Sequence, residues 1–171
     1  MPKDEDPAVY HDDVIERLNQ FVLAAKGTDI LLCHENEKGI YGDNAQRCLD
    51  ILKNVDGLYG VFDPANFIQC GQDTAVAWDM LKDYIKYMHI KDALPDGTIV
   101  PAGEGAGNIA AITKDFIARG GRCFTIEPHL TEFIGLAGLE REGDKTNINN
   151  KRYSSANEAF DAAVAAFRSV L

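Results

Sequence analysis

The sequence lacks any apolar run of about 20 residues, the length that a membrane-spanning helix needs. Its first residues, MPKDEDP, lack the apolar stretch of a signal peptide. It also has no CxxC pair, because its four cysteines are scattered along the chain at Cys33, Cys48, Cys70 and Cys123. This spacing argues against a zinc ribbon or a disulfide framework. We therefore expect reduced thiols in a cytoplasmic protein that has no membrane partner.

Positive charge is scarce as well. The 17 Lys and Arg residues are outnumbered by 27 Asp and Glu residues, and the net charge is −10 at pH 7. A nucleic-acid partner usually requires a basic face, so this balance argues against one. The glycine-rich stretch PAGEGAG lacks the spacing of a dinucleotide fingerprint, and no strand pattern runs directly into it. We interpret it as a flexible loop, with phosphate binding at the start of the following helix as the alternative.

What is present is the pattern of a single α/β domain over residues 1–171, long enough to form its own core. Short apolar runs predict strands, and helical spacing of apolar residues predicts helices between them. The predicted strands are 30–33, 58–62, 85–90 and 123–126, and the predicted helices are 6–27, 43–52, 74–83, 108–118 and 155–171. Such strict alternation favours parallel βαβ units.

The predicted elements also assign residues to the core. The first strand is apolar throughout, which is typical of strands covered on both faces. Helical spacing places Phe21, Val76 and Phe160 among the inward-facing residues of their helices. A polar segment at 138–152 is predicted to be a surface excursion.

Each predicted strand has, at or just past its C-terminal end, a side chain that can bind a metal. These residues are Glu35, Asp63, His89 and Glu127, spaced 28, 26 and 38 residues apart, or about one βα unit per step. The C-terminal ends of parallel strands meet at one rim, where ligands bind in such folds. A carboxylate in this place is more often a helix cap or a solvated residue, but four successive coincidences favour a site. The set suits a divalent metal.

Several of these stretches together resemble the sugar phosphate isomerase/epimerase family, whose members are xylose isomerase-like TIM barrels. The stretches are HENEKGIYGD, FDPANF, YMHIKDA, VPAGEGAGNI and IEPHL. The resemblance implies that Glu35, Asp63, His89 and Glu127 hold one divalent ion (Mn, Mg, Co or Zn). It also implies that Glu35 and Glu127 are the catalytic acid/base pair. Proton transfer next to a metal-bound carbonyl or hydroxyl of a small sugar or sugar phosphate would then isomerise or epimerise it.

Two of the neighbouring polar residues, Asn66 and Lys91, have two interpretations each. Asn66 either contacts substrate or caps a turn. Lys91 either binds a substrate hydroxyl or phosphate, or pairs with Asp92 or Glu104. His129 is expected to reach the mouth of the site. Strand alternation turns His34 away from the Glu35 side, so we expect it either to support a ligand from behind or to pack in the core. We count Asn66, Lys91 and His129 as candidate substrate-binding residues.

The chain departs from the family in size, since its members have eight βα units and this sequence supplies the last four, preceded by one helix. The expected fold is therefore half of a TIM barrel. Two alternatives to an enzyme of this family stay open: an inactive remnant that binds metal or sugar or only assembles, and a type-2 AP endonuclease. The endonuclease would need more histidines and a basic face.

Size also bears on assembly. Four parallel strands cannot close a barrel, so both outer strands would be free edges. We expect a homodimer or higher oligomer, in its simplest form two half-barrels in which the last strand of one chain pairs with the first strand of the other. The alternative joins like edges antiparallel into an open eight-stranded sheet, with the two sites facing opposite ways.

Overall fold

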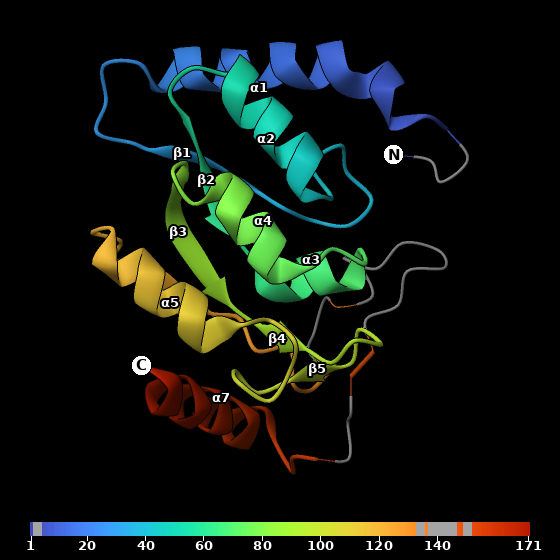
Figure 1. Cartoon of the computed structure of the whole chain (residues 1–171), viewed down its shortest axis with the longest axis vertical. Coiled ribbons are helices and arrows are strands. Elements are labelled where there is room, and N and C mark those ends of the chain that lie inside the picture. The colour runs from blue at the N-terminus through green and yellow to red at the C-terminus, as the bar shows by residue number, and fades with distance from the viewer. Residues whose placement is uncertain (2–4, 133–135, 137–146, 149–151) are drawn as a thin grey trace.

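The computed structural model describes residues 1, 5–132, 136, 147–148 and 152–171 (Figure 1). Most of the predicted surface excursion at 138–152 lies outside these residues. A four-stranded parallel sheet has the order β1-β2-β3-β6. Its strands are β1 (Leu32–Glu35), β2 (Leu58–Phe62), β3 (Ile85–Ile90) and β6 (Phe124–Ile126). This arrangement confirms the predicted run of parallel βα units.

The helices follow one another along the longest axis of the molecule, from α1 at one end to α7 at the other (Figure 1). In chain order they are η1 (Pro7–Tyr10), α1 (His11–Ala25), α2 (Ala45–Asn54), α3 (Pro64–Gln69), α4 (Thr74–Leu81), α5 (Ile109–Ala118) and α7 (Ala156–Val170). Side-chain caps fix several starts, because Asn44, Asp73 and Ser155 each accept a hydrogen bond from a backbone N–H in the first turn of α2, α4 and α7. None of the described helices is long and apolar enough to cross a bilayer.

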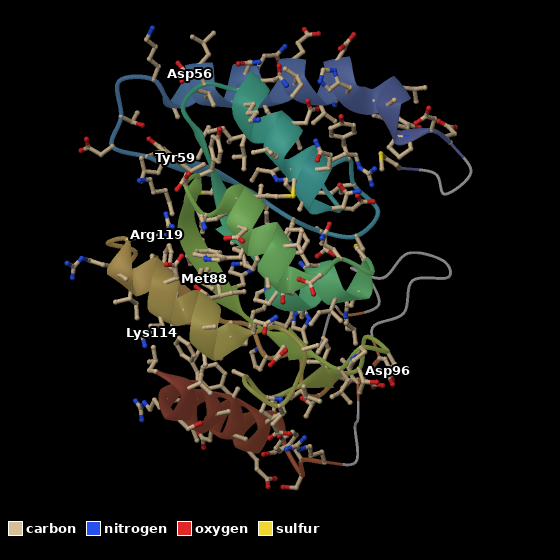
Figure 2. The ribbon with its side chains drawn as sticks, viewed as in Figure 1. Asp56, Tyr59, Met88, Asp96, Lys114 and Arg119 are labelled. Carbon is tan, nitrogen blue, oxygen red and sulfur yellow. The ribbon has the colours of Figure 1, made fainter. Side chains whose placement is uncertain are left out.

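The main core lies between the helices and one face of the sheet. Phe62 and Met88 point from the strands into this layer and are fully buried; Met88 is labelled in Figure 2. Trp78 of α4 contacts two rings edge-on, Phe62 at 5.2 Å and Phe116 at 6.2 Å between ring centroids. Because alternate strand residues face opposite sides, the other face of the sheet carries Tyr87, His89 and the rest of the strand-end cluster.

The register of the sheet shows how much of a barrel it represents. Glu35 pairs with Val61, so Asp63 lies two residues further along β2. His89 is level with Asp63, since Val61 pairs with Tyr87, and Glu127 lies two residues beyond Thr125, the partner of His89. From Glu35 to Glu127, the position along the strands therefore shifts by about four residues in register across the sheet. This shift is half of the register offset of about eight residues that closes a TIM barrel.

Five residues that were predicted to be buried are exposed. Ile30 and Leu31, predicted to start the first strand, precede β1 and are 64% and 61% exposed, because β1 is an edge strand with no neighbour on its outer side among the described residues. Phe21, Val76 and Phe160 are exposed rather than inward-facing. In α7 the small residues Ala159 and Ala163 face the core together with Phe167, which allows the helix to approach closely and turns Phe160 outward.

Two elements were not predicted. Helix α3 begins directly after Asp63, with Pro64 in its first turn. A short antiparallel hairpin, β4 (Asp92–Ala93) with β5 (Ile99–Val100), forms between the predicted strand 85–90 and the predicted helix 108–118. None of the four cysteines, all of which lie in the described part of the chain, forms a disulfide. The cytoplasmic location stays a prediction.

Candidate metal centre

Four side chains from four different strands converge at the C-terminal rim of the sheet. Each of Glu35, Asp63, His89 and Glu127 offers one ligand atom, and these atoms all lie within 4.8 Å of one another. Nδ1 of His89 is central, at 2.9 Å from Glu35 Oε1, 3.3 Å from Glu127 Oε2 and 3.7 Å from Asp63 Oδ2. The structure thus brings together all four predicted ligands, including the two from the outer strands of the sheet.

Among the four candidate ligands, Asp63 has hydrogen bonds that fix both its backbone and its side chain. Asn36, which is buried, accepts a hydrogen bond from the Asp63 N–H and donates one to the Asp63 carbonyl, each at 2.9 Å. The carboxylate atom Oδ1 accepts a 3.0 Å bond from the Asn66 N–H and so caps α3. These contacts leave Oδ2 aimed into the cluster.

Lys91 completes the cluster from the end of β3. Its ammonium Nζ lies 2.9 Å from Asp63 Oδ2 and 3.2 Å from Glu127 Oε2, and its side chain is only 4% exposed. The predicted alternative, a pair with Asp92 or Glu104, is wrong, because Asp92 accepts backbone N–H groups and Glu104 pairs with Arg152. Lys91 therefore faces two of the candidate metal ligands.

The close charges shift several pKa values in opposite directions. Burial acts to lower the pKa of His89, but the neighbouring Asp63, Glu127 and Glu35 carboxylates outweigh it and raise that pKa. Burial likewise opposes the charge of Lys91, yet Asp63 and Glu127 raise its pKa. Burial acts to raise the pKa of Glu127, but His129, His89 and Lys91 hold it well below its usual range. The Glu127 carboxylate is therefore anionic at neutral pH.

The donor set fits a divalent cation. It offers three carboxylates and one imidazole, a combination typical of Mn²⁺, Mg²⁺, Co²⁺ and Zn²⁺ sites. Asp63 Oδ2 is fully buried and meets no hydrogen-bond criterion among the described residues, and the Lys91 ammonium lies 2.9 Å from it as a counter-charge. A metal ion at this point would give this oxygen a direct ligand bond.

The remaining candidate residues surround the four ligands. Asn66 donates through Nδ2 to the Asn36 carbonyl at 2.9 Å and lies 3.4 Å from Glu35 Oε1. His129 lies with Nε2 3.6 Å from Glu127 Oε1. His34 faces the core as predicted, beside Gly42, and burial lowers its pKa to about 4.

Sequence reasoning missed two residues of the site. Asn36 positions Asp63, as described above, and Glu37 lies with Oε2 3.3 Å from Asn66 Nδ2. Burial raises the pKa of Glu37. Both follow Glu35 directly in HENE, so their position near the end of the first strand indicated that they lie near the site but did not indicate what they contact.

This geometry agrees with the comparison to known families. The model of the xylose isomerase-like TIM barrel family matches residues 1–152. The chain belongs to this family. No curated protein sequence matches it.

Solved structures of the same architecture show the fold alone, since their sequences are less than 25% identical to this chain. D-psicose 3-epimerase from Clostridium cellulolyticum H10, solved with D-tagatose, superposes with a TM-score of 0.71 at 17% identity over 99% of this chain and 59% of its own. A xylose isomerase-like TIM barrel protein from Mycobacterium smegmatis in complex with magnesium has a TM-score of 0.63 at 19% identity, covering 98% and 54%.

A zinc-containing structure of the IOLI protein has a TM-score of 0.64 at 16% identity and covers 99% of this chain and 59% of its own. The chain thus spans between half and three fifths of the length of these proteins. Its fold is a partial TIM barrel.

Proposed function

We propose that the chain binds one divalent metal ion through Glu35, Asp63, His89 and Glu127 and isomerises or epimerises a small sugar or sugar phosphate. The observation that carries the proposal is the convergence of these four ligand atoms within 4.8 Å of one another, with the Asp63 oxygen fully buried. Solved relatives of the fold with magnesium or zinc, and others that are sugar epimerases, support both the metal and the substrate class.

The two glutamates are placed to act as a proton-transfer pair. Glu35 ends β1 and Glu127 follows β6, the two outer strands of the sheet, so they approach the cluster from opposite sides. When bound, a divalent ion supplies Lewis-acid polarisation of substrate oxygens. One glutamate then removes a proton from the carbon next to the carbonyl, and the other returns one from the opposite face.

Three further side chains are proposed to bind the substrate. Asn66 and Lys91 offer hydrogen-bond donors from within the cluster, and His129 lies beside Glu127. Lys91 is the strongest candidate, because a buried ammonium next to the ligands suits a substrate hydroxyl, carbonyl or phosphate oxygen.

A metal-binding or purely structural role without catalysis is the second candidate. Lys91 favours it, since its charge already balances part of the acidic cluster without a metal. The partial length of the chain relative to its structural relatives points the same way.

Exchange of carbon-bound hydrogen distinguishes the two candidates. The chain is loaded with Mn²⁺ and incubated in D₂O with D-psicose, D-fructose or D-tagatose, and deuterium at the carbon next to the carbonyl is followed by NMR. An isomerase or epimerase incorporates deuterium only with metal, and Glu127→Gln abolishes the exchange. Metal binding without exchange of any of these sugars would favour the non-catalytic role.

Self-association stays a proposal. The edges of β1 and β6 lack a neighbouring strand among the described residues, and Ile30 and Leu31 next to β1 are exposed. A second copy related by a two-fold axis along the strands would place its β1 beside β6 of the first chain, with the two strands parallel. The register offset of about four residues in each chain would then add up to the offset of about eight residues in a closed barrel. Sedimentation at micromolar concentration tests this: a dimer is expected, and a monomer of 18.8 kDa would refute it.

A further inference from the structure

A cavity lies at the opposite end of the sheet from the metal centre. It has a volume of about 380 Å³ and is lined by the start of β3, the end of α5 and the turn that leads to β6. Its charged residues are Lys82, Asp83, Lys86, Arg119 and Arg122. Four cations against one carboxylate is an unusual concentration in a chain whose net charge is −10.

Two of these cations already have carboxylate partners. Arg119 lies 2.7 Å from Asp115 and 2.9 Å from Asp83, so it is fixed and Asp83 is neutralised. Lys82 pairs with Asp79. Both follow the last residue of a helix, where a cation complements the helix dipole. They shape the cavity without requiring a ligand.

The other two cations have no carboxylate partner among the described residues. Lys86 lies over the ring of Tyr59, 5.1 Å from its centroid, which fixes the direction of its side chain. Arg122 is exposed and lies between Gly121 and Cys123 at the cavity wall. Lys86 and Arg122 are both exposed residues of the cavity lining, so together they offer positive charge to an anion that enters it, and the planar guanidinium suits a phosphate group.

We propose that this cavity binds the phosphate group of a small phosphorylated molecule, with Lys86 and Arg122 as its ligands. The site is separate from the metal centre, because Lys86 precedes Lys91 by five residues of extended chain, or about 16 Å. A volume of this size accommodates a small metabolite rather than a single ion. The inference does not depend on the catalytic proposal.

Inorganic pyrophosphate is a suitable probe, titrated calorimetrically into the 171-residue chain at low ionic strength with EDTA present. Saturable binding is expected, and the double substitution Lys86→Ala with Arg122→Ala should weaken it by about tenfold or more, since two charge-assisted contacts are lost. Lys114→Ala is the matched control: Lys114 is exposed on α5, and its loss changes the net charge by one as each substitution does (Figure 2).

The outcomes distinguish specific binding of the anion in this cavity from nonspecific attraction of the anion to positive surface charge. Unchanged affinity in Lys114→Ala with weakened affinity in the double variant supports the site. Absence of saturable binding by the wild type, or an equal loss in Lys114→Ala, overturns it. Circular dichroism and a separate Mn²⁺ titration without EDTA show that each variant is folded with its metal centre intact, so failure here is distinguishable from failure of the proposed function.

Discussion

Replacing Asp92 with asparagine should destabilise the fold more than any change on the surface. The Asp92 carboxylate is 1% exposed and accepts four backbone N–H groups. Oδ1 accepts from Ala93 at 2.9 Å and Gly107 at 2.8 Å, and Oδ2 accepts from Gly103 at 2.9 Å and Gly105 at 3.1 Å. One side chain thus fixes the glycine-rich loop between β5 and α5.

The magnitude follows from counting donors. The side-chain oxygen of asparagine can still accept hydrogen bonds from one pair of N–H groups. Its amide nitrogen is a donor, so it cannot accept from the other pair, which loses its hydrogen bonds. Each buried donor left without a partner costs about 1–3 kcal/mol, so two cost about 2–6 kcal/mol. A domain of this size is stable by about 5–15 kcal/mol, and the loss is a large share of it.

Urea unfolding measures this loss through far-UV circular dichroism and the fluorescence of Trp78, the single tryptophan of the chain. With a slope of about 2 kcal/mol per molar urea, the midpoint should fall by about 1 M or more. Asp161→Asn, at an exposed position of α7, makes the same change of charge and should leave the midpoint in place. An Asp92→Asn midpoint equal to that of Asp161→Asn would show that the four hydrogen bonds do not stabilise the loop.

Three further predictions concern packing and thiol chemistry. Gly105→Ala places a Cβ 2.4 Å from the Ala93 carbonyl oxygen and should cost about 1–3 kcal/mol, measured by thermal unfolding. Phe62→Ala removes a fully buried ring next to Trp78 and should cost about 3–5 kcal/mol in urea; a cost below 1 kcal/mol, of the order that surface changes show, would contradict the core assignment. Burial raises the pKa of the Cys48 thiol to about 12, so at mildly alkaline pH iodoacetamide should modify the exposed Cys123 and leave Cys48 intact, as mass spectrometry of the native chain would show.

The order of strands and helices was predictable because strands show as short runs of apolar residues, whereas helices show apolar residues at helical spacing. The metal ligands were predictable for a related reason: parallel strands end at one rim, so a polar residue after each strand lands in one place. Glu35 and Glu127 illustrate this, since they lie 92 residues apart in the sequence and meet the same histidine.

What the sequence could not show depends on contacts between distant segments. The exposure of Ile30 and Leu31 follows from the position of β1 at the edge of the sheet, which no local pattern encodes. Helix α3 is six residues long and begins inside the stretch FDPANF, too short for a helical period to appear. The two bonds between Asn36 and Asp63 join residues 27 positions apart, so only the fold reveals that Asn36 positions a ligand.

Titration of the metal-free chain with Mn²⁺ tests the central claim most directly. The account predicts one ion bound per chain, with binding weakened strongly in His89→Ala and Asp63→Asn and unchanged in Asp161→Asn. Absence of Mn²⁺ binding by the wild type, or equal binding by His89→Ala and Asp63→Asn, would contradict the assignment of these residues to a metal centre.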